Sequence, residues 1–257
     1  MATKIIKPFS ENLNSQVRTA YLESITRPVS YDGGKTSRPR VRHYKMWEAI
    51  PPFDKPIDII NTVKCPEQNI WIWSDLHFGH NNIIKFSDRP YKDTTEMDEQ
   101  LIQNFQNLVG PDDISIWVGD VSFRGYTETA KILYRLPGYK ILIVGNHDFE
   151  RKKGLRKMPF DEVHICYNLQ VDDTYLAFTH YPMDNLPLEW INVHGHVHVH
   201  GHHADEVKST SHINVNCEFI EYKPISLQQL IDQVESMSTM KKAGNIKPAK
   251  IDYTEYD

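Results

Sequence analysis

The sequence predicts an α/β fold with much parallel strand pairing. Beyond residue 69, short runs of Ile, Val and aromatic residues have the length of β-strands. Segments in which apolar residues recur at helical spacing lie between several of these runs. Such alternation is typical of parallel sheets covered by helices. The predicted strands are residues 70–73, 114–118, 141–144, 175–178 and 191–193, and the predicted helices between them are residues 95–108 and 127–136.

Composition divides the chain into three predicted parts. Residues 1–68 form a basic, partly irregular N-terminal extension, with a net charge of +4, seven prolines and helical periodicity only around residues 15–25. We expect this extension to contribute one short helix that packs on the following domain. The catalytic domain is predicted over residues 69–236 and ends in a helix over residues 227–236. Residues 237–257 are polar, lack periodicity and are expected to form a C-terminal tail.

Composition also excludes several classes of protein. Of the 257 residues, 40% are hydrophobic, which is enough for a sizeable core. No apolar run approaches the ~20 residues that span a bilayer, and the N-terminus lacks the apolar segment of a signal peptide. The three cysteines form no CxxC pair, which argues against a disulfide framework and a thiolate zinc site. We therefore expect a cytoplasmic protein without membrane association. The net charge of −5 argues against stable nucleic-acid binding.

Polar side chains follow every predicted strand. In α/β sheets, sites form at the carboxyl ends of strands, so these side chains are expected to converge. Histidine is the commonest metal ligand, and six of the 13 histidines lie between His194 and His203. The convergent set supplies carboxylate, amide and imidazole groups, and its members are Asp75, His77, Asp120, Asn146, His180, His196 and His198.

These seven groups predict a pair of metal ions. Oxygen and imidazole donors without thiolate suit hard to borderline divalent cations. Seven ligands are too many for one catalytic ion that keeps an open position, but they suit two ions ~3.5–4 Å apart that share a carboxylate. Residues two apart in extended backbone project to the same side, so Asp75 with His77, and His196 with His198, can face one cavity.

The ordered motifs DLH, GD, GNHD, TH and GHVH resemble those of the calcineurin-like metallophosphoesterase superfamily over roughly residues 69–230. Residues 74–80, followed by Asn82-Ile83-Ile84, Arg89-Pro90 and Met97-Asp98, look like a small bacterial and phage branch of this superfamily. The resemblance implies a four-layer αββα sandwich, in which helices flank two mixed sheets. If the chain is phage-encoded, the expected cytoplasm is that of the host.

The resemblance assigns a role to each motif position. It implies that Asp75, His77 and His198 bind the first ion. It implies that Asn146, His180 and His196 bind the second, and that Asp120 bridges the two. His147 is expected to protonate the leaving group, with Asp148 orienting its imidazole. Arg124 matches a phosphate-holding arginine in spacing, although Phe123 stands where an acidic residue is often found.

The expected cofactor is two divalent metal ions, Mn²⁺ first, with Ni²⁺, Co²⁺, Fe²⁺, Zn²⁺ and Mg²⁺ as alternatives. Two cations lower the pKa of a water between them, which makes hydroxide available for in-line attack on phosphorus. Because the ligands bind metal in their deprotonated forms, metal occupancy should fall in acid.

Other polar residues near the motifs carry weaker expectations. For His80 and Asn81, substrate contact and simple turn packing are equally compatible with the pattern. Arg89 is expected to form a structural salt bridge. Structural or surface roles are expected for the remaining histidines, which are His43, His164, His194, His200, His202, His203 and His212.

The predicted function is hydrolysis of a small phosphomonoester, with a (deoxy)nucleoside 5′-monophosphate as the best guess from the resemblance. The alternative is a phosphodiesterase or nuclease that uses the same metals on cyclic nucleotides or nucleic acid. A third class, a catalytically inactive scaffold, is disfavoured because every motif position is filled. The chain has no G-x-S-x-G elbow for a serine hydrolase and no G-x-G-x-x-G loop for a dinucleotide.

Overall fold

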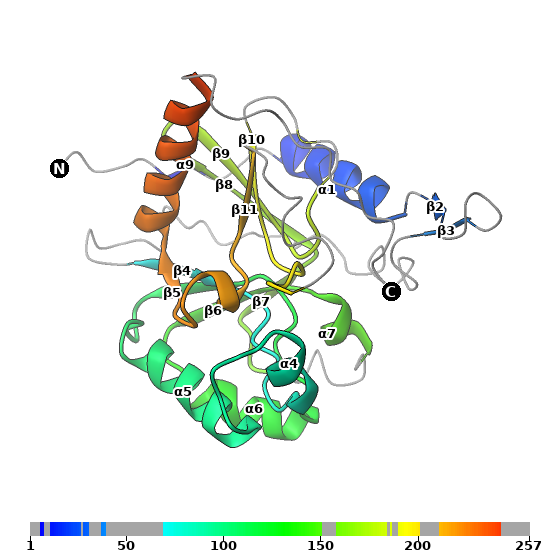
Figure 1. The fold of residues 1–257 in the computed structure, drawn as a ribbon. Coiled ribbons are helices and arrows are strands. Elements are labelled where there is room, and N and C mark those ends of the chain that lie inside the picture. Colours follow the sequence, from blue (N-terminus) through cyan, green and yellow to red (C-terminus); the bar gives the residue numbers. More distant parts are fainter. Residues whose placement is uncertain are drawn as a thin grey trace.

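Two five-stranded mixed sheets form the framework of the molecule, as the ribbon in Figure 1 shows. The computed structural model describes residues 6–7, 11–26, 28–30, 37–39, 69–150, 158–183, 186, 190–200 and 211–242. His43, His202 and His203 therefore lie outside the described residues. Among the described helices, none combines the length and the apolar character that crossing a bilayer requires.

The first sheet has the strand order β12-β4-β5-β6-β7. Strands β4, β5, β6 and β7 run parallel to one another, and β12 pairs antiparallel with β4. The strands are β4 (Ile70–Trp73), β5 (Ile114–Trp117), β6 (Tyr139–Ile143), β7 (Glu162–His164) and β12 (Ile225–Ser226). The parallel pairing predicted from the sequence is thus present in this sheet.

Three helices cover the outer face of the first sheet: α4 (Asn81–Phe86), α5 (Thr94–Gln106) and α6 (Tyr126–Tyr134). Helix α5 begins where the side chain of Asp93 accepts the backbone N–H groups of Thr95 and Glu96, which is N-terminal capping. The buried Met97, Leu101 and Phe105 recur at intervals of four residues and face the sheet.

The second sheet has the order β1-β8-β9-β10-β11. Strands β9, β10 and β11 run parallel, and β1 and β8 join antiparallel. The strands are β1 (Ile6–Lys7), β8 (Cys166–Val171), β9 (Thr174–Thr179), β10 (Trp190–His194) and β11 (His212–Asn214). The two sheets with flanking helices confirm the predicted α/β sandwich.

Alternation along the strands creates two apolar layers. Ile70 and Ile72 of β4 belong to a core that also contains Leu176 and Phe178 of β9, and this core fills the space between the sheets. Trp73 points to the opposite face. Its ring centroid lies 4.8 Å from that of Trp117, which it meets edge-on, and 4.9 Å from that of Phe105 on α5, whose ring is tilted. The tryptophan that ends β4 is thus a core residue.

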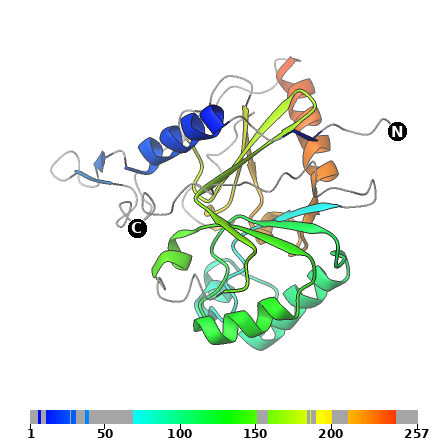
Figure 2. The ribbon, with the colours of Figure 1, turned by 180° about the vertical axis from the view of Figure 1, so that it is seen from behind.

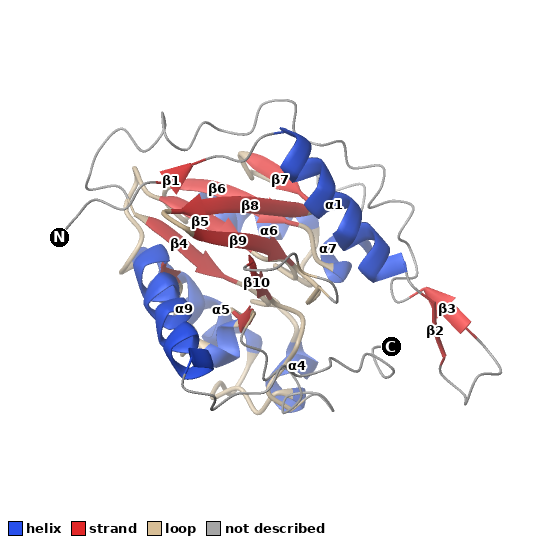
Figure 3. Cartoon of the chain, turned by 90° about the horizontal axis from the view of Figure 1, so that it is seen from above, coloured by secondary structure: helices blue, strands red, loops and turns tan. Residues whose placement is uncertain are grey.

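Two long helices flank the sandwich. Helix α1 (Glu11–Thr26) lies against β8. Figure 2 shows this arrangement from behind and Figure 3 from above. Helix α9 (Leu227–Lys242) packs against β12 and β4 and extends six residues past the predicted end at 236. The first residues of the predicted polar tail are therefore helical. The remaining elements are the β2 (Pro28–Ser30) and β3 (Ser37–Pro39) ribbon, α7 (Asn146–Glu150) and the 3₁₀ turn η1 (Cys217–Phe219).

Candidate metal centre

The carboxyl ends of strands from both sheets meet at one rim. Asp75 follows β4 and Asp120 follows β5, and the N–H of Asp75 donates to Gly119 O at 3.0 Å while that of His77 donates to Asp120 O at 3.0 Å. From the second sheet, the N–H of Gly195 donates to His180 O at 3.1 Å. These bonds continue the strand ladders into the turns, so the turn side chains are held in a fixed arrangement.

The structure brings Asp75, His77 and His198 into one group, with one possible ligand atom from each lying within 4.8 Å of the others. Asp75 Oδ1 is 3.9 Å from His77 Nε2 and 3.8 Å from His198 Nε2. These separations exceed hydrogen-bond lengths. An ion with bonds of about 2.0–2.2 Å to each atom can span them.

A second group contains Asp120, His180 and His196, again with ligand atoms within 4.8 Å of one another. His180 Nε2 lies 3.5 Å from Asp120 Oδ2. Asn146 joins this group, since its Oδ1 is 3.0 Å from His180 Nε2. All seven side chains predicted as ligands therefore lie in two neighbouring groups.

Asp120 lies between the groups. Its Oδ2 is 3.7 Å from Nε2 of His77 in the first group and 3.5 Å from Nε2 of His180 in the second. A single carboxylate oxygen within reach of both groups is what two ions in contact with a shared ligand require.

The imidazole of His77 tests whether these residues fit a cation. Both of its ring nitrogens are buried without a hydrogen-bond partner among the described residues. A buried polar atom left in this state costs about 1–3 kcal/mol, so native structures seldom tolerate it. A cation bound to one nitrogen would remove part of this cost. The donor set and this imidazole together fit divalent metal ions.

Four of the seven side chains project from left-handed backbone. The φ angles are +56° at Asp75, +53° at His77, +54° at Asp120 and +68° at His196. Non-glycine residues adopt this region rarely, at a cost of order 1–3 kcal/mol each. Backbone strain of this kind clusters at functional sites. Here it turns side chains from successive strands toward one cavity.

Gly119 allows His180 to approach the turn before Asp120. Its φ is +92°, and a Cβ at this position would lie 2.5 Å from Nδ1 of His180. Because glycine has no Cβ, Nδ1 can lie 2.8 Å from the carbonyl oxygen of Val118. This contact orients the ring and leaves Nε2 toward Asp120.

Burial and the charges of neighbouring side chains both shift the pKa values in the centre. It raises the pKa of Asp75, and it lowers the pKa values of His77 and His196, which favours neutral imidazole. For Asp120, burial alone would raise the pKa, but His180 and other imidazoles lower it well below its ordinary value. For His180, the carboxylate of Asp120 outweighs burial and raises the pKa to about 9. A metal ion must therefore displace the proton of His180 when it binds.

Glu218 supports the first group from behind. One carboxylate oxygen lies 2.7 Å from Nδ1 of His198, and the same oxygen accepts Arg89 Nη2 at 2.8 Å. Burial raises the pKa of Glu218, but His198 and Arg89 outweigh it and lower the pKa to about 2. Glu218 was not predicted from the sequence. Glu218 follows the short strand β11. Prediction of that strand would have placed Glu218 among the polar residues at strand ends.

Arg89 forms the expected salt bridge, with Glu218, and also contacts the backbone that follows β4. Its guanidinium donates to the carbonyl oxygens of Asp75 at 2.8 Å and Leu76 at 2.9 Å. The side chain is fully buried. Arg89 and Glu218 thus connect the two segments that carry the first group of donors.

Asp148 has a different place from the one expected. Its carboxylate accepts the backbone N–H groups of Asp120 at 2.9 Å, Val121 at 3.0 Å and Gly145 at 2.8 Å. These contacts assign Asp148 to the backbone around Asp120, rather than to the imidazole of His147. Asp148 lies on the first turn of α7, and its carboxylate faces the backbone at the strand ends.

His147 lies at the edge of the centre. Its backbone N–H donates to Asp120 Oδ1 at 2.9 Å, and its Nε2 is 3.9 Å from Asp120 Oδ2. Phe123 separates His147 from His80: the Phe123 ring stacks on His80 at 3.7 Å and lies 4.5 Å from the His147 ring. Asn81 begins α4 with an exposed side chain.

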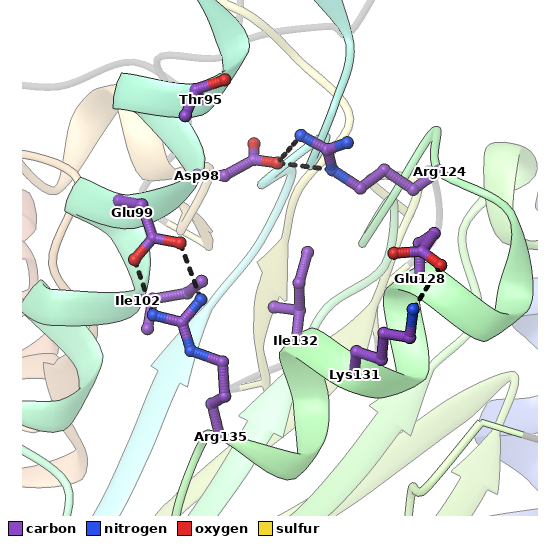
Figure 4. Close-up of a pocket in the computed structure, with 9 residues that line it drawn as sticks. All are labelled: Thr95, Asp98, Glu99, Ile102, Arg124, Glu128, Lys131, Ile132 and Arg135. Carbon is purple, nitrogen blue, oxygen red and sulfur yellow. Dashed lines mark hydrogen bonds and ion pairs between the residues drawn. The ribbon is translucent and has the colours of Figure 1, made fainter.

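Arg124 pairs with Asp98, whose carboxylate also accepts the N–H of Gly79 at 2.9 Å. Figure 4 shows this pair at the rim of a pocket between α5 and α6. The charges that line the pocket are balanced, with three acidic and three basic side chains in the pairs Asp98–Arg124, Glu99–Arg135 and Glu128–Lys131. Phosphate contact by Arg124 stays a prediction.

Other histidines make structural contacts. His164 Nε2 lies 2.5 Å from Glu162, and His212 Nε2 is 2.9 Å from the carbonyl oxygen of Met183. His194 is fully buried, and its Nδ1 lies 2.8 Å from Gly195 O. The half-exposed His200 side chain lies 3.3 Å from Asp88.

The geometry agrees with comparisons to known proteins. The family model described as calcineurin-like phosphoesterase matches residues 68–236. The chain belongs to this family. A calcineurin-like phosphoesterase is a phosphoric ester hydrolase that uses divalent metal ions, and the two donor groups of this chain are its candidate metal sites.

Relatives of this phosphoesterase come from archaea, phages and bacteria. An uncharacterized protein of Methanocaldococcus jannaschii is 30% identical over 192 residues, which cover 70% of this chain and 98% of that protein. The gene 66 protein of Mycobacterium phage L5 is 26% identical over 57% of this chain and 82% of its own length. A crystal structure of a protein of unknown function from Aquifex aeolicus has a TM-score of 0.52 and 28% identity, covering 65% of this chain and all of that one. These relatives fit the expected small phage and bacterial branch.

Proposed function

We propose that this chain is a phosphomonoesterase that hydrolyses a (deoxy)nucleoside 5′-monophosphate with two divalent cations, Mn²⁺ first among them. The observation that carries the proposal is the position of Asp120, whose Oδ2 lies within 3.7 Å of ring nitrogens from both donor groups. We further propose that it acts in the cytoplasm, of the host if phage-encoded. The free cysteines Cys166 and Cys217 agree with a reducing compartment.

The donor groups would hold the ions as the sequence motifs imply. Asp75, His77 and His198 would hold one ion, and Asn146, His180 and His196 the other, with Asp120 shared. When bound, two such cations supply a water of lowered pKa and neutralise charge that develops on the phosphoryl oxygens. The chain contributes a buried, pre-oriented set of donors for them.

His147 is proposed as the proton donor to the leaving oxygen. Its side chain is 31% exposed, whereas those of His77 and His180 are almost fully buried, so His147 can meet a bound ester from the solvent side. The hydrogen bond from its N–H to Asp120 Oδ1 fixes its backbone beside the shared carboxylate. A general acid in such a position contributes ~10²–10⁴-fold to rate.

Asp120→Asn tests the proposal, with the exposed Asp172→Asn as a matched control. Metal content and release of inorganic phosphate are measured for a panel of nucleoside 5′-monophosphates. The wild type and the control should bind two Mn²⁺ ions and hydrolyse monoesters, and Asp120→Asn should lose both properties. Turnover by the wild type in metal-free buffer would contradict the proposal. Preferential cleavage of cyclic or linear diesters in the same panel would establish the phosphodiesterase alternative.

A further inference from the structure

Helix α1, which lies in the predicted N-terminal extension, reaches the metal centre through Tyr21. This tyrosine is fully buried, and its hydroxyl oxygen accepts the backbone N–H of Tyr181 at 3.2 Å. The two residues are 160 positions apart, and Tyr181 directly follows His180 of the second donor group. The contact therefore links the extension to the chain segment that carries a candidate ligand.

The Tyr21 hydroxyl lies beside the chain segment that carries His180. Burial raises the pKa of Tyr21, the backbone N–H groups of Tyr181 and His180 lower it, and the charges of Cys166 and Asp120 raise it further. The ring of Tyr181 in turn lies 4.0 Å from the ring of His196, so Tyr181 contacts both imidazole ligands of the second group: it is bonded to one and packed on the other.

We infer that Tyr21 is a positioning residue for the second metal site, so that α1 completes the centre. This inference rests on the proposed two-metal function. Strand β9 ends at Thr179, and beyond it the Tyr181 N–H finds its acceptor on α1 rather than on a neighbouring strand. That bond fixes the backbone that carries His180, while the Val118 carbonyl at 2.8 Å fixes its ring.

Tyr21→Phe isolates the effect of the hydroxyl. The substitution keeps the buried ring and removes one oxygen, which leaves the Tyr181 N–H without this acceptor. Loss of an outer hydrogen-bond partner typically weakens metal affinity by about 10–100-fold. We expect a loss of this size for one of the two Mn²⁺ ions only, because the ring of Tyr181 packs against His180 and His196, which both belong to the second group.

Val17→Ala is the matched control. Val17 is buried on the same helix, one turn before Tyr21, and belongs to the same core. Its truncation should lower the thermal stability and leave both Mn²⁺ affinities unchanged. If Tyr21 acted only by packing α1 onto the sheet, the two variants would behave alike.

The test uses the full chain, Mn²⁺ alone as the ligand, and two readouts. Calorimetric titration gives the two affinities, and electron paramagnetic resonance gives the signal of a spin-coupled Mn²⁺ pair. At a Mn²⁺ concentration that fills both sites of the wild type, Tyr21→Phe should show an uncoupled ion. Equal affinities and an equal coupled signal in Tyr21→Phe and the wild type would overturn the inference.

Two further outcomes separate this inference from the proposed function. A wild type that binds two Mn²⁺ ions but hydrolyses no phosphomonoester would refute the proposed function and leave the positioning role supported by the affinities. A wild type that binds one ion would refute both. If Tyr21→Phe does not fold, the hydrogen-exchange rate of the Tyr181 amide in the wild type tests the inference instead. A Tyr181 amide that exchanges as fast as exposed amides would overturn the inference, and a strongly protected one would support it.

Discussion

The carboxylate of Glu218 lies 2.7 Å from Nδ1 of His198 and thereby directs Nε2 of that ring toward Asp75, 3.8 Å away. Carboxylates behind histidine ligands fix the tautomer of the ring and raise its basicity. Here the carboxylate is itself held by the buried guanidinium of Arg89. The first donor group therefore depends on a charge that lies outside it.

Glu218→Gln should weaken Mn²⁺ binding at the first group by about 10–100-fold, because the neutral amide binds the imidazole less strongly and leaves Arg89 without its counter-charge. Calorimetric titration measures the effect. Glu221→Gln is the control, since the side chain of Glu221 is 89% exposed. Equal affinities in the two variants would mean that Glu218 does not act on the metal site.

His147→Ala should lose roughly 10²–10⁴-fold in kcat on a monoester with a poor leaving group, while both metal ions stay bound. The expected loss should shrink for an ester such as p-nitrophenyl phosphate, whose leaving group needs no proton. Steady-state kinetics on both esters, with metal analysis of the same samples, checks this. A variant that loses metal would show that His147 is a ligand instead.

Gly119→Ala should disrupt the second donor group. The new methyl group would lie 2.5 Å from His180 Nδ1, in backbone with a φ of +92°. We expect a loss of about 1–3 kcal/mol in the free energy of unfolding, together with weaker binding of one Mn²⁺ ion. Urea denaturation and metal titration measure the two effects. In the control Gly125→Ala the methyl group meets nothing within 4 Å, and an equal loss there would refute the steric argument.

Asp113 should make the stability of the fold depend on pH. Burial raises its pKa, but hydrogen bonds from the N–H groups of Gly110 and Asn69 and from the indole of Trp71 outweigh burial and lower the pKa below 3.8. A carboxyl group whose pKa is lower in the folded protein stabilises the fold at every pH above its pKa in the unfolded chain. This stabilisation is lost as the pH falls through the pKa of the folded protein.

Asp113→Asn should therefore cost about 1–3 kcal/mol at pH 7 and progressively less toward pH 3. Urea denaturation with a chelator present, at several pH values, measures the difference from the wild type. The exposed Asp173→Asn serves as the control. A difference that stays constant between pH 7 and pH 3 would contradict the role of the ionised carboxylate.

The sequence predicted the strands that carry the donors because each combines a strongly apolar run with an abrupt polar end. β4, β5, β6, β9 and β10 all have this form. It did not predict β7, β11 or β12, which are two or three residues long, or β8, in which polar residues interrupt the apolar ones. Such strands depend on their neighbours for stability rather than on their own composition.

Tertiary contacts explain what else escaped prediction. Helical periodicity indicated the helix α1, but nothing local shows that Tyr21 contacts the residue after His180. The pairing of β1 with β8 joins residues more than 160 positions apart through two residue pairs. The resemblance implied that Asp148 orients the imidazole of His147, whereas its carboxylate accepts the backbone N–H groups of Asp120 and Val121.

Each donor group draws on both sheets. Asp75 and His77 follow a strand of the first sheet and His198 a strand of the second, and the other group joins Asp120 of the first sheet to His180 and His196 of the second. Cations bound there would cross-link the halves of the sandwich at one edge. By mass action, an ion at 100 times its Kd adds about 2.7 kcal/mol to folding. The melting temperature of this protein should consequently follow the free metal concentration, so heat resistance and catalytic competence would be gained or lost together.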